Sequence, residues 1–367
     1  MPDIALRFHK DMLVLSSPVR AALARQGVDV NRDLELITLI EPDSLTEAMR
    51  LEIMAGAQCI VANTAGLTPA RMAQAGMEDR AGDVAAAALS VARKLVPQHI
   101  LVEVGPCGLP LDKTSKASLN ENRDQYARAA RLFAGETFDA FFLNGFETTS
   151  DLLCALMGTR QASDAPVFAS VDVLPDGTLA SGRETLEDAV RVMQEYGASV
   201  VGFETGAPIE AACELASRAA SVSDLPILVQ LSVSKRDPKQ GGPTDENPYY
   251  CPDAVVDAAV RLRARGVQFL RAVGDSTPAY TGALAATVAG LDVALSPREA
   301  ALAAGTGAED AGDAEVPAQP GEPADAGASA ASEGAEVASA ATDAQIGELA
   351  EALRSKVEAA FSDAGRA

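Results

Sequence analysis

Eight short apolar runs recur within the first 298 residues, and each is followed by a segment with helical periodicity. The runs are MLVL (12–15), CIVAN (59–63), ILVEV (100–104), AFFLN (140–144), VFASV (167–171), SVVGFE (199–204), ILVQL (227–231) and QFLRAV (268–273). Between them, segments such as 79–95 and 251–266 carry amphipathic helical patterns. Nearly continuous apolar strands that alternate with amphipathic helices indicate a parallel sheet covered by helices.

Eight strand–helix units in about 290 residues predict a (β/α)8 barrel, a TIM-type α/β fold. The loops after the first, third and seventh runs are long, and an open doubly wound sheet is the alternative. In a barrel, the chemistry lies at the carboxyl ends of the strands. Those ends carry Asn63, Thr64, Gly105, Pro106, Asn144, Asp172, Glu204, Thr205, Ser232 and the tripeptide Val273-Gly274-Asp275.

The sequence changes character after residue 298, which ends the barrel domain expected over 10–298. Residues 299–341 form an acidic Ala/Gly/Pro tract, which predicts a disordered linker because few large apolar side chains offset the chain entropy. Residues 342–363 repeat apolar side chains at three- and four-residue spacing and predict a terminal amphipathic helix. This helix either folds onto the barrel or binds a partner protein.

The formal charge of −22 argues against binding to nucleic acid or to an anionic membrane surface. Residues 299–367 contain 14 acidic and 3 basic residues, so half of this charge lies in the tail. The first apolar run is too short for a secretory signal, and no run has the length of a membrane span. Five scattered cysteines without a CxxC pair indicate reduced, buried thiols. These features predict a cytoplasmic protein.

Three segments resemble the homocysteine S-methyltransferase family. They are AGAQCIVANT (55–64), VEVGPCGLPL (102–111) and the stretch from DENPYYCP (245–252) to RAVGDSTP (271–278). The resemblance extends over about residues 10–295. The family includes the homocysteine-binding barrel of cobalamin-dependent methionine synthase and the betaine-dependent homocysteine methyltransferases. The resemblance implies a (β/α)8 barrel that transfers a methyl group to a thiol held by a zinc ion.

The family binds that zinc through three cysteines, one in a G-x-N-C stretch after strand six and two in GGCCG-TTP after strand eight. At these places the present sequence has Thr205, Val273 and Gly274. Zinc is therefore not expected, because none of these side chains replaces a thiolate ligand. Among the five cysteines, only Cys107 is expected near the barrel mouth. Whether Cys107 joins a substitute metal site is left open.

We therefore expect a divergent methyltransferase that acts on a small thiol or an amino-acid-like substrate. Glu204 and Asp275 are the candidate catalytic residues, as a general base or as partners of a cationic group, although both can also be solvated carboxylates. The candidate substrate-binding residues are Asn63, Thr64, Gly105, Asn144 and Thr205. The methyl donor could be a methylated corrinoid on a partner protein.

The alternative is a non-catalytic barrel that binds a small ligand or a partner protein and regulates or scaffolds a corrinoid methyl-transfer system. The acidic linker and the terminal helix favour this alternative. The polar residues at the strand ends favour the enzyme.

Overall fold

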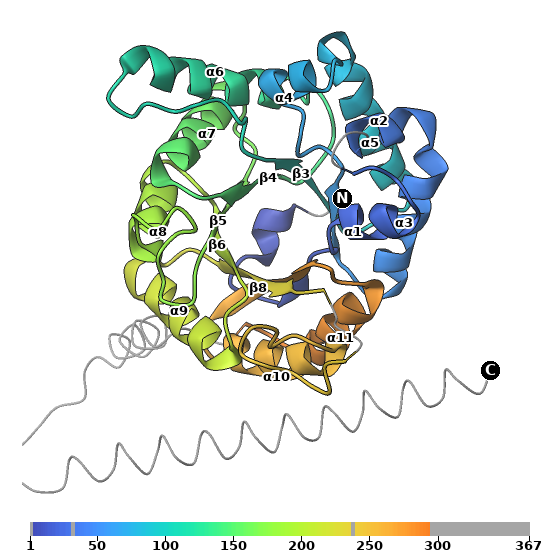
Figure 1. The fold of residues 1–367 in the computed structure, drawn as a ribbon, viewed down its shortest axis with the longest axis vertical. Helices are drawn as coiled ribbons and strands as arrows, with labels where there is room; N and C mark the ends of the chain where they lie inside the picture. Colours follow the sequence, from blue (N-terminus) through green and yellow to red (C-terminus); the bar gives the residue numbers. More distant parts are fainter. Residues whose placement is uncertain (1–2, 31–33, 236–238, 294–367) are drawn as a thin grey trace, which may run out of the picture. The chain divides into compact units, whose positions relative to one another are not determined.

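The computed structural model describes residues 3–30, 34–235 and 239–293, and in them eight parallel strands form one sheet inside a ring of helices (Figure 1). The strands are β1 (Leu13–Val14), β2 (Cys59–Ala62), β3 (His99–Val104), β4 (Ala140–Phe146), β5 (Val167–Asp172), β6 (Val200–Thr205), β7 (Ile227–Val233) and β8 (Val267–Gly274). Each one overlaps an apolar run of the sequence, so all eight predicted strands are confirmed.

The strand order is β1-β8-β7-β6-β5-β4-β3-β2, which leaves β1 and β2 at the two ends of the sheet. A parallel bridge between Leu15 and Cys59 joins these ends. The Ser16 N–H also donates to the Cys59 carbonyl oxygen over 2.9 Å. The sheet therefore curls into a nearly closed barrel. The TIM-type fold is confirmed, and the open doubly wound sheet is excluded.

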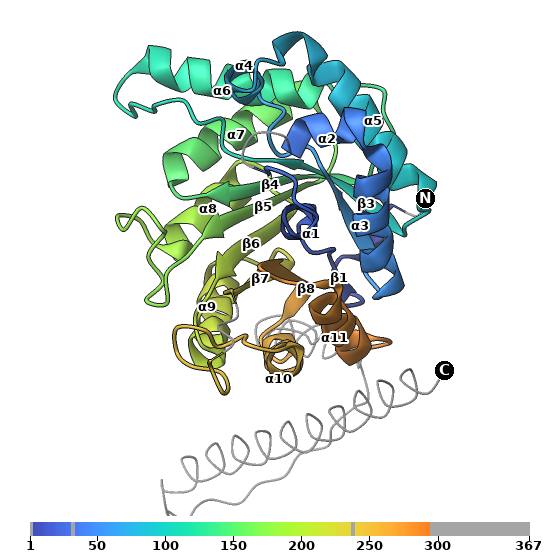
Figure 2. The same ribbon diagram turned by 45° about the vertical axis from the view of Figure 1, so that its right-hand side comes forward.

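Helices cover the outside of the barrel, and Figure 2 shows α11 against β1 and β8. The α-helices are α1 (Val19–Arg25), α2 (Leu34–Ile40), α3 (Pro42–Met54), α4 (Pro69–Gln74), α5 (Ala81–Lys94), α6 (Lys116–Arg131), α7 (Thr149–Ala162), α8 (Leu186–Glu195), α9 (Ile209–Val222), α10 (Pro252–Arg263) and α11 (Pro278–Val288). Two 3₁₀ helices are η1 (Ile4–Arg7) and η2 (Glu78–Arg80). Local signals fix several helix starts. Thr185 and Asp188, for example, form a capping box at the start of α8.

An apolar cluster fills the amino-terminal half of the barrel interior. Its side chains come from every strand, and Phe168 and Phe269 pack edge to face with ring centroids 4.8 Å apart. Phe8, which follows η1, packs edge-on against both rings at 6.1 Å. This end of the barrel is therefore sealed, and the polar side chains of the interior lie toward the carboxyl ends of the strands.

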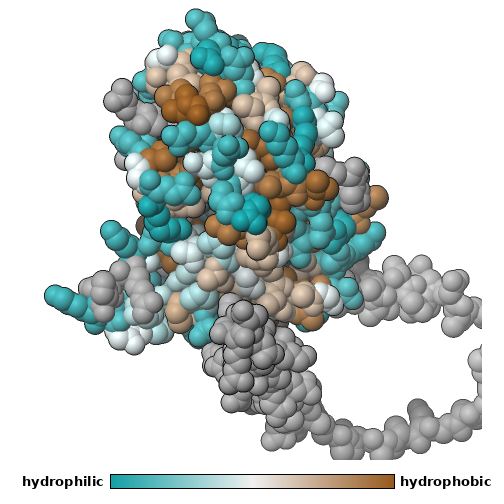
Figure 3. Space-filling model, turned by 90° about the vertical axis from the view of Figure 1, so that its right-hand side faces the viewer, coloured by the Kyte–Doolittle hydropathy of each residue, from teal (hydrophilic) through white to brown (hydrophobic). Residues whose placement is uncertain are grey.

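Polar and apolar residues are interspersed on the face of the molecule in Figure 3. Among the described residues, no helix is both long enough and apolar enough to cross a membrane. The barrel belongs to the unit Met1–Ala294. The linker expected over 299–341 and the helix expected over 342–363 lie outside the described residues.

Candidate functional site

A row of four polar residues crosses the inner wall of the barrel on adjacent strands. Asp172 on β5 is in register with Glu204 on β6, which is in register with Gln230 on β7. Gln230 is in turn in register with Arg271 on β8. Residues in register on neighbouring parallel strands point to the same side of the sheet, and Gln230 hydrogen-bonds across the interior. All four side chains therefore face the barrel interior.

Arg271 is the buried centre of this interior, with an exposed fraction of 0%. Its Nε donates to the Ser16 carbonyl oxygen over 2.9 Å, and its Nη1 donates to Gln230 Oε1 over 3.1 Å. The same Nη1 lies 3.8 Å from Glu103 Oε1 on β3, and the guanidinium carbon lies 5.3 Å from the centre of the Phe142 ring. Arg271 Nη2 has no hydrogen-bond partner among the described residues. A buried cation with one open nitrogen can bind an acceptor group of a ligand.

Hydrogen bonds continue from Arg271 across the barrel to the opposite strands. Gln230 Nε2 donates to Asn144 Oδ1 on β4 over 2.7 Å and to Ser170 Oγ on β5 over 2.8 Å. Asn144 Nδ2 in turn donates to Glu103 Oε1 over 2.7 Å. Because each amide is satisfied at both of its ends, the network fixes the side chains of five strands in one arrangement.

The pKa values of two carboxyl groups in the row, Asp172 and Glu204, are raised. Burial raises the pKa of Asp172, and the neighbouring charges of Glu204 and Glu147 raise it further, to about 7. Burial also raises the pKa of Glu204, although a hydrogen bond from Ser232 and the charge of Arg271 oppose this effect. Asp172 Oδ1 is buried and has no hydrogen-bond partner among the described residues. A strongly perturbed carboxyl group inside a barrel mouth is a candidate for acid–base chemistry.

A cavity of about 750 Å³ lies next to this network. Glu103, Gly105 and Asn144 contribute to its lining from the ends of β3 and β4. Glu35 of α2 and Arg71 of α4 line its other sides. Its volume is in the range of small-molecule sites. Because Glu103 and Asn144 belong to both, the cavity and the polar network are continuous.

The residues expected at the mouth fall into different environments. Gly105 and Asn144 line the cavity, and Glu204 lies in the polar row. Asn63 instead donates from its side chain to the Leu34 carbonyl oxygen and to Thr38 Oγ1, and it thereby holds α2.

The hydroxyl groups of the two expected threonines also bond to the protein itself. Thr64 Oγ1 donates to the Glu103 carbonyl oxygen over 2.8 Å, and Thr205 Oγ1 accepts from the Ala207 N–H over 3.2 Å. Both threonines are buried. These bonds stabilise the loops that follow β2 and β6.

Asp275 lies outside the polar row. Its side chain is 45% exposed, and its Oδ1 lies 3.4 Å from Nη1 of Arg25 on α1. Its N–H donates to the Val233 carbonyl oxygen over 2.8 Å, which ties the end of β8 to β7. The structure therefore separates the two candidate catalytic carboxylates into an interior group, Glu204, and a surface group, Asp275.

Comparison with known proteins identifies the family. The family model for homocysteine S-methyltransferase matches residues 14–275. This chain belongs to the homocysteine S-methyltransferase family. Methionine synthase of Mycobacterium tuberculosis strain H37Rv is 24% identical over 271 residues, which cover 70% of this chain and 22% of that protein. The chain thus spans about one fifth of the length of this relative.

Solved structures support the same fold. The homocysteine methyltransferase MmuM from Escherichia coli in its metallated form matches with a TM-score of 0.62 and 17% identity, over 75% of this chain and 96% of that one. The oxidized form of MmuM matches with a TM-score of 0.63 and 16% identity, over 75% and 95% of the two chains.

The zinc site implied by the family does not fit the residues at the corresponding strand ends. Thr205 is engaged by Ala207, Val273 offers no ligand atom, and Gly274 has φ +72°. A Cβ at position 274 would lie 2.4 Å from the Val233 carbonyl oxygen, so this backbone does not accept a cysteine without moving. Within the described ranges, no three His, Cys, Asp or Glu side chains are grouped in a way that could hold a metal ion.

Cys107 does not face the mouth, and the expectation that it does is wrong. Its thiol is buried and donates to Asn122 Oδ1 of α6 over 3.1 Å. Its N–H donates to the Tyr126 hydroxyl group over 3.0 Å. Burial raises the pKa of this thiol, which disfavours the thiolate that a metal requires. Cys107 therefore anchors the loop after β3 to α6.

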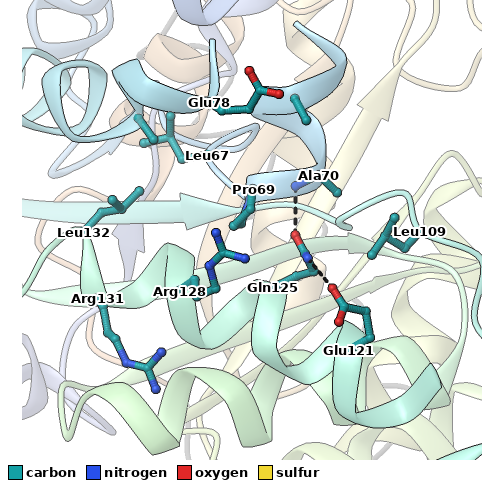
Figure 4. Close-up of a pocket in the computed structure, with 12 residues that line it drawn as sticks. Leu67, Pro69, Ala70, Glu78, Leu109, Glu121, Gln125, Arg128, Arg131 and Leu132 are labelled. Atoms are coloured by element: carbon teal, nitrogen blue, oxygen red, sulfur yellow. Dashed lines mark hydrogen bonds between the residues drawn. The ribbon is translucent and has the colours of Figure 1, made fainter. Parts of the chain in front are cut away.

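A second cavity, of about 620 Å³, lies among α4, η2, α5 and α6, at the level of the helices (Figure 4). Leu67, Leu109 and Leu132 contribute apolar surface to it. Gln125 bridges its two sides by accepting from the Ala70 N–H over 2.8 Å and donating to the Glu121 carboxylate over 2.9 Å. None of the residues predicted for the site lines this cavity.

Proposed function

We propose that this chain transfers a methyl group to a small thiol or an amino-acid-like acceptor bound at the carboxyl ends of the barrel strands, without a zinc site. The observation that carries the proposal is the polar network of Arg271, Gln230, Asn144 and Glu103 beside the 750 Å³ cavity. Membership of a methyltransferase family supports the reaction class. A polar interior of this kind suits a ligand that carries both charge and hydrogen-bonding groups.

We assign ligand contact to Asn144 and Gly105, which line the cavity, and acid–base chemistry to the carboxyl pair of the polar row, Asp172 and Glu204. Asn63, Thr64 and Thr205 act indirectly in this scheme, because their side chains hold the loops around the cavity. Asp275 would meet a ligand only after it releases Arg25, which makes it a candidate group at the rim.

The name of the methionine synthase relative makes L-homocysteine the first acceptor to test. The methyl donor is proposed to be either a small methylated compound or a methylated corrinoid on a partner protein. Without a zinc ion to stabilise the thiolate, the protein must supply a base for the acceptor. The carboxyl groups of the polar row are suited to that role.

Two experiments on the full-length protein test this function. A thermal-shift screen with homocysteine, other thiols, methylated amines and corrinoids should raise the melting temperature for one acceptor class, because a ligand that binds only the folded state stabilises it. Incubation of that acceptor with isotopically labelled methyl donors should then give a methylated product, and a chelator should not prevent it.

The outcomes of these experiments distinguish an enzyme from a non-catalytic barrel. A ligand that stabilises the protein but is methylated with none of the donors supports the non-catalytic barrel that regulates or scaffolds a methyl-transfer system. Activity that a chelator abolishes and zinc restores refutes the zinc-independent part of the proposal.

A further inference from the structure

Two polar atoms of the polar row lack a partner among the described residues: one is an acceptor and the other is a donor. Asp172 Oδ1 is an acceptor without a donor, and Arg271 Nη2 is a donor without an acceptor. A buried polar group without a partner destabilises the folded protein. The neighbouring polar side chains of Gln230 and Asn144 are already bonded to each other and to Ser170 and Glu103. A ligand that brings one protic group and one acceptor group would satisfy both open atoms.

The two atoms lie in one polar row. Arg271 is fully buried, and its charge acts on Glu204, which is in register with Asp172. Asp172 and Glu204 are partly exposed as whole residues, although Asp172 Oδ1 itself is buried, and both lie near the carboxyl ends of their strands. Asp172 therefore lies at the accessible end of the row, and Arg271 lies at the buried end.

We propose that Asp172 is the proton acceptor of this site and removes the proton from the nucleophilic atom of the methyl acceptor. This assignment rests on the methyl-transfer function proposed above, and it deepens that proposal by dividing the work between two carboxyl groups. Glu204, which is in register with Asp172, is the second carboxyl group, and its charge contributes to the raised pKa of Asp172. Arg271 Nη2 binds the acceptor group of the same ligand.

For a thiol, the step is a proton transfer followed by methyl transfer. The S–H bond breaks, its electron pair stays on sulfur, and the proton forms an O–H bond with the Asp172 carboxylate. The sulfur pair then forms the S–CH₃ bond with an electrophilic methyl donor, whose own bond to the methyl group breaks with the electron pair left on the donor. Asp172 returns its proton to solvent before the next cycle.

The environment of Asp172 fits this role. Its carboxyl pKa of about 7 compares with an ordinary aspartate value of 3.8. Proton transfer from a thiol with a pKa of about 8.5 to this carboxylate is unfavourable by about 30-fold. The same transfer to an ordinary aspartate is unfavourable by about 50,000-fold. The charged groups that raise this pKa are Glu204 on β6 and Glu147 after β4; Glu103 on β3 and Arg271 on β8 act on Glu204.

The test uses the full-length protein with L-homocysteine as the acceptor, and its readout is the rate of methyl transfer as a function of pH. In the unmodified protein, the rate should rise with pH through the Asp172 pKa of about 7. Asp172→Asn should slow methyl transfer by about 10²- to 10⁴-fold and remove this rise, while homocysteine still raises the melting temperature. Glu204→Gln should move the rise to lower pH, because Glu204 contributes to the raised pKa of Asp172.

Asp164→Asn is the matched control, because Asp164 is an exposed aspartate at the opposite end of β5. It should leave the rate and its pH dependence unchanged. A rate that survives in Asp172→Asn, with its rise near the same pH, overturns the assignment of Asp172 and leaves the proposed methyl transfer intact. An unmodified protein that yields product with none of the donors refutes the methyl transfer and, with it, the role of Asp172.

Discussion

Replacing Asp172 by asparagine should stabilise the protein increasingly as the pH rises from 5.5 to 8. The folded-state pKa of about 7 lies above the ordinary aspartate value of 3.8, which applies to the unfolded chain. Between these two values the unfolded chain has released the Asp172 proton while the folded protein still binds it, so the free energy of unfolding falls as the pH rises. At about 1.36 kcal/mol per pH unit, the full loss is about 4 kcal/mol, of which about 2 kcal/mol falls above pH 5.5.

Asparagine does not titrate, so the stability of Asp172→Asn should lack this component. The measurement is the free energy of unfolding from urea titrations of both proteins at several pH values from 5.5 to 8. The difference between them should grow by about 2 kcal/mol and level off above the folded-state pKa of about 7. Any cost of the new amide is independent of pH and cancels from this change. A difference that stays constant, or that equals the difference found for Asp164→Asn, would show that the pKa of Asp172 is not raised.

Three further predictions concern the interior and the strand ends. Arg271→Met should lower the free energy of unfolding by about 3–5 kcal/mol in urea titrations, because it leaves buried acceptors without their cation. A loss below about 1 kcal/mol would show that the network is not important for stability. Gly274→Ala should lower the melting temperature, since its Cβ would lie 2.4 Å from the Val233 carbonyl oxygen, whereas Gly241→Ala, with nothing within 4 Å, should not. Metal analysis after dialysis should find no stoichiometric zinc, and one zinc per chain that is lost on replacement of Cys107 would contradict the zinc-independent site.

The strands of the barrel could be predicted because buried parallel strands require apolar residues on both faces. The eight runs therefore mark the strands to within two residues at either end. The largest differences are at the ends of β4 and β7, where Gly145-Phe146 and Ser232-Val233 extend the runs AFFLN and ILVQL. In both cases the residue after the run, Gly145 or Ser232, is not apolar, so the apolar pattern stops although the backbone pairing continues.

The polar network could not be predicted from the strand ends alone. Glu103, Gln230 and Arg271 lie inside the runs ILVEV, ILVQL and QFLRAV rather than after them. The available signal was a long polar or charged side chain within an apolar strand, which must find partners when it is buried. The partners themselves depend on the register between strands that are distant in sequence, and the sequence pattern does not contain that register.

The residues that do follow the strands have two uses that look alike in the sequence. A small polar side chain at a strand end can face a ligand or turn back to hold the next loop. Asn63 does the second, by donating to α2, whereas Asn144 joins the interior network and lines the cavity. The same amide group serves both purposes, so only the three-dimensional path of the following loop distinguishes them.

The polar row lowers the stability of the fold, because it places two carboxyl groups side by side in the barrel interior. A destabilising arrangement of this kind indicates a functional role. Asp172 and Glu204 are neighbouring carboxyl groups in register, both partly buried, and burial raises the pKa of each. An apolar pair at these positions would avoid both the repulsion and the open Oδ1 atom. Local violations of folding rules of this kind concentrate at functional sites, where a ligand supplies the missing partner. Glu204 directly precedes Thr205, which stands where the resemblance places one of the family's three zinc cysteines. The carboxyl pair therefore lies beside a position at which this sequence departs from the family pattern.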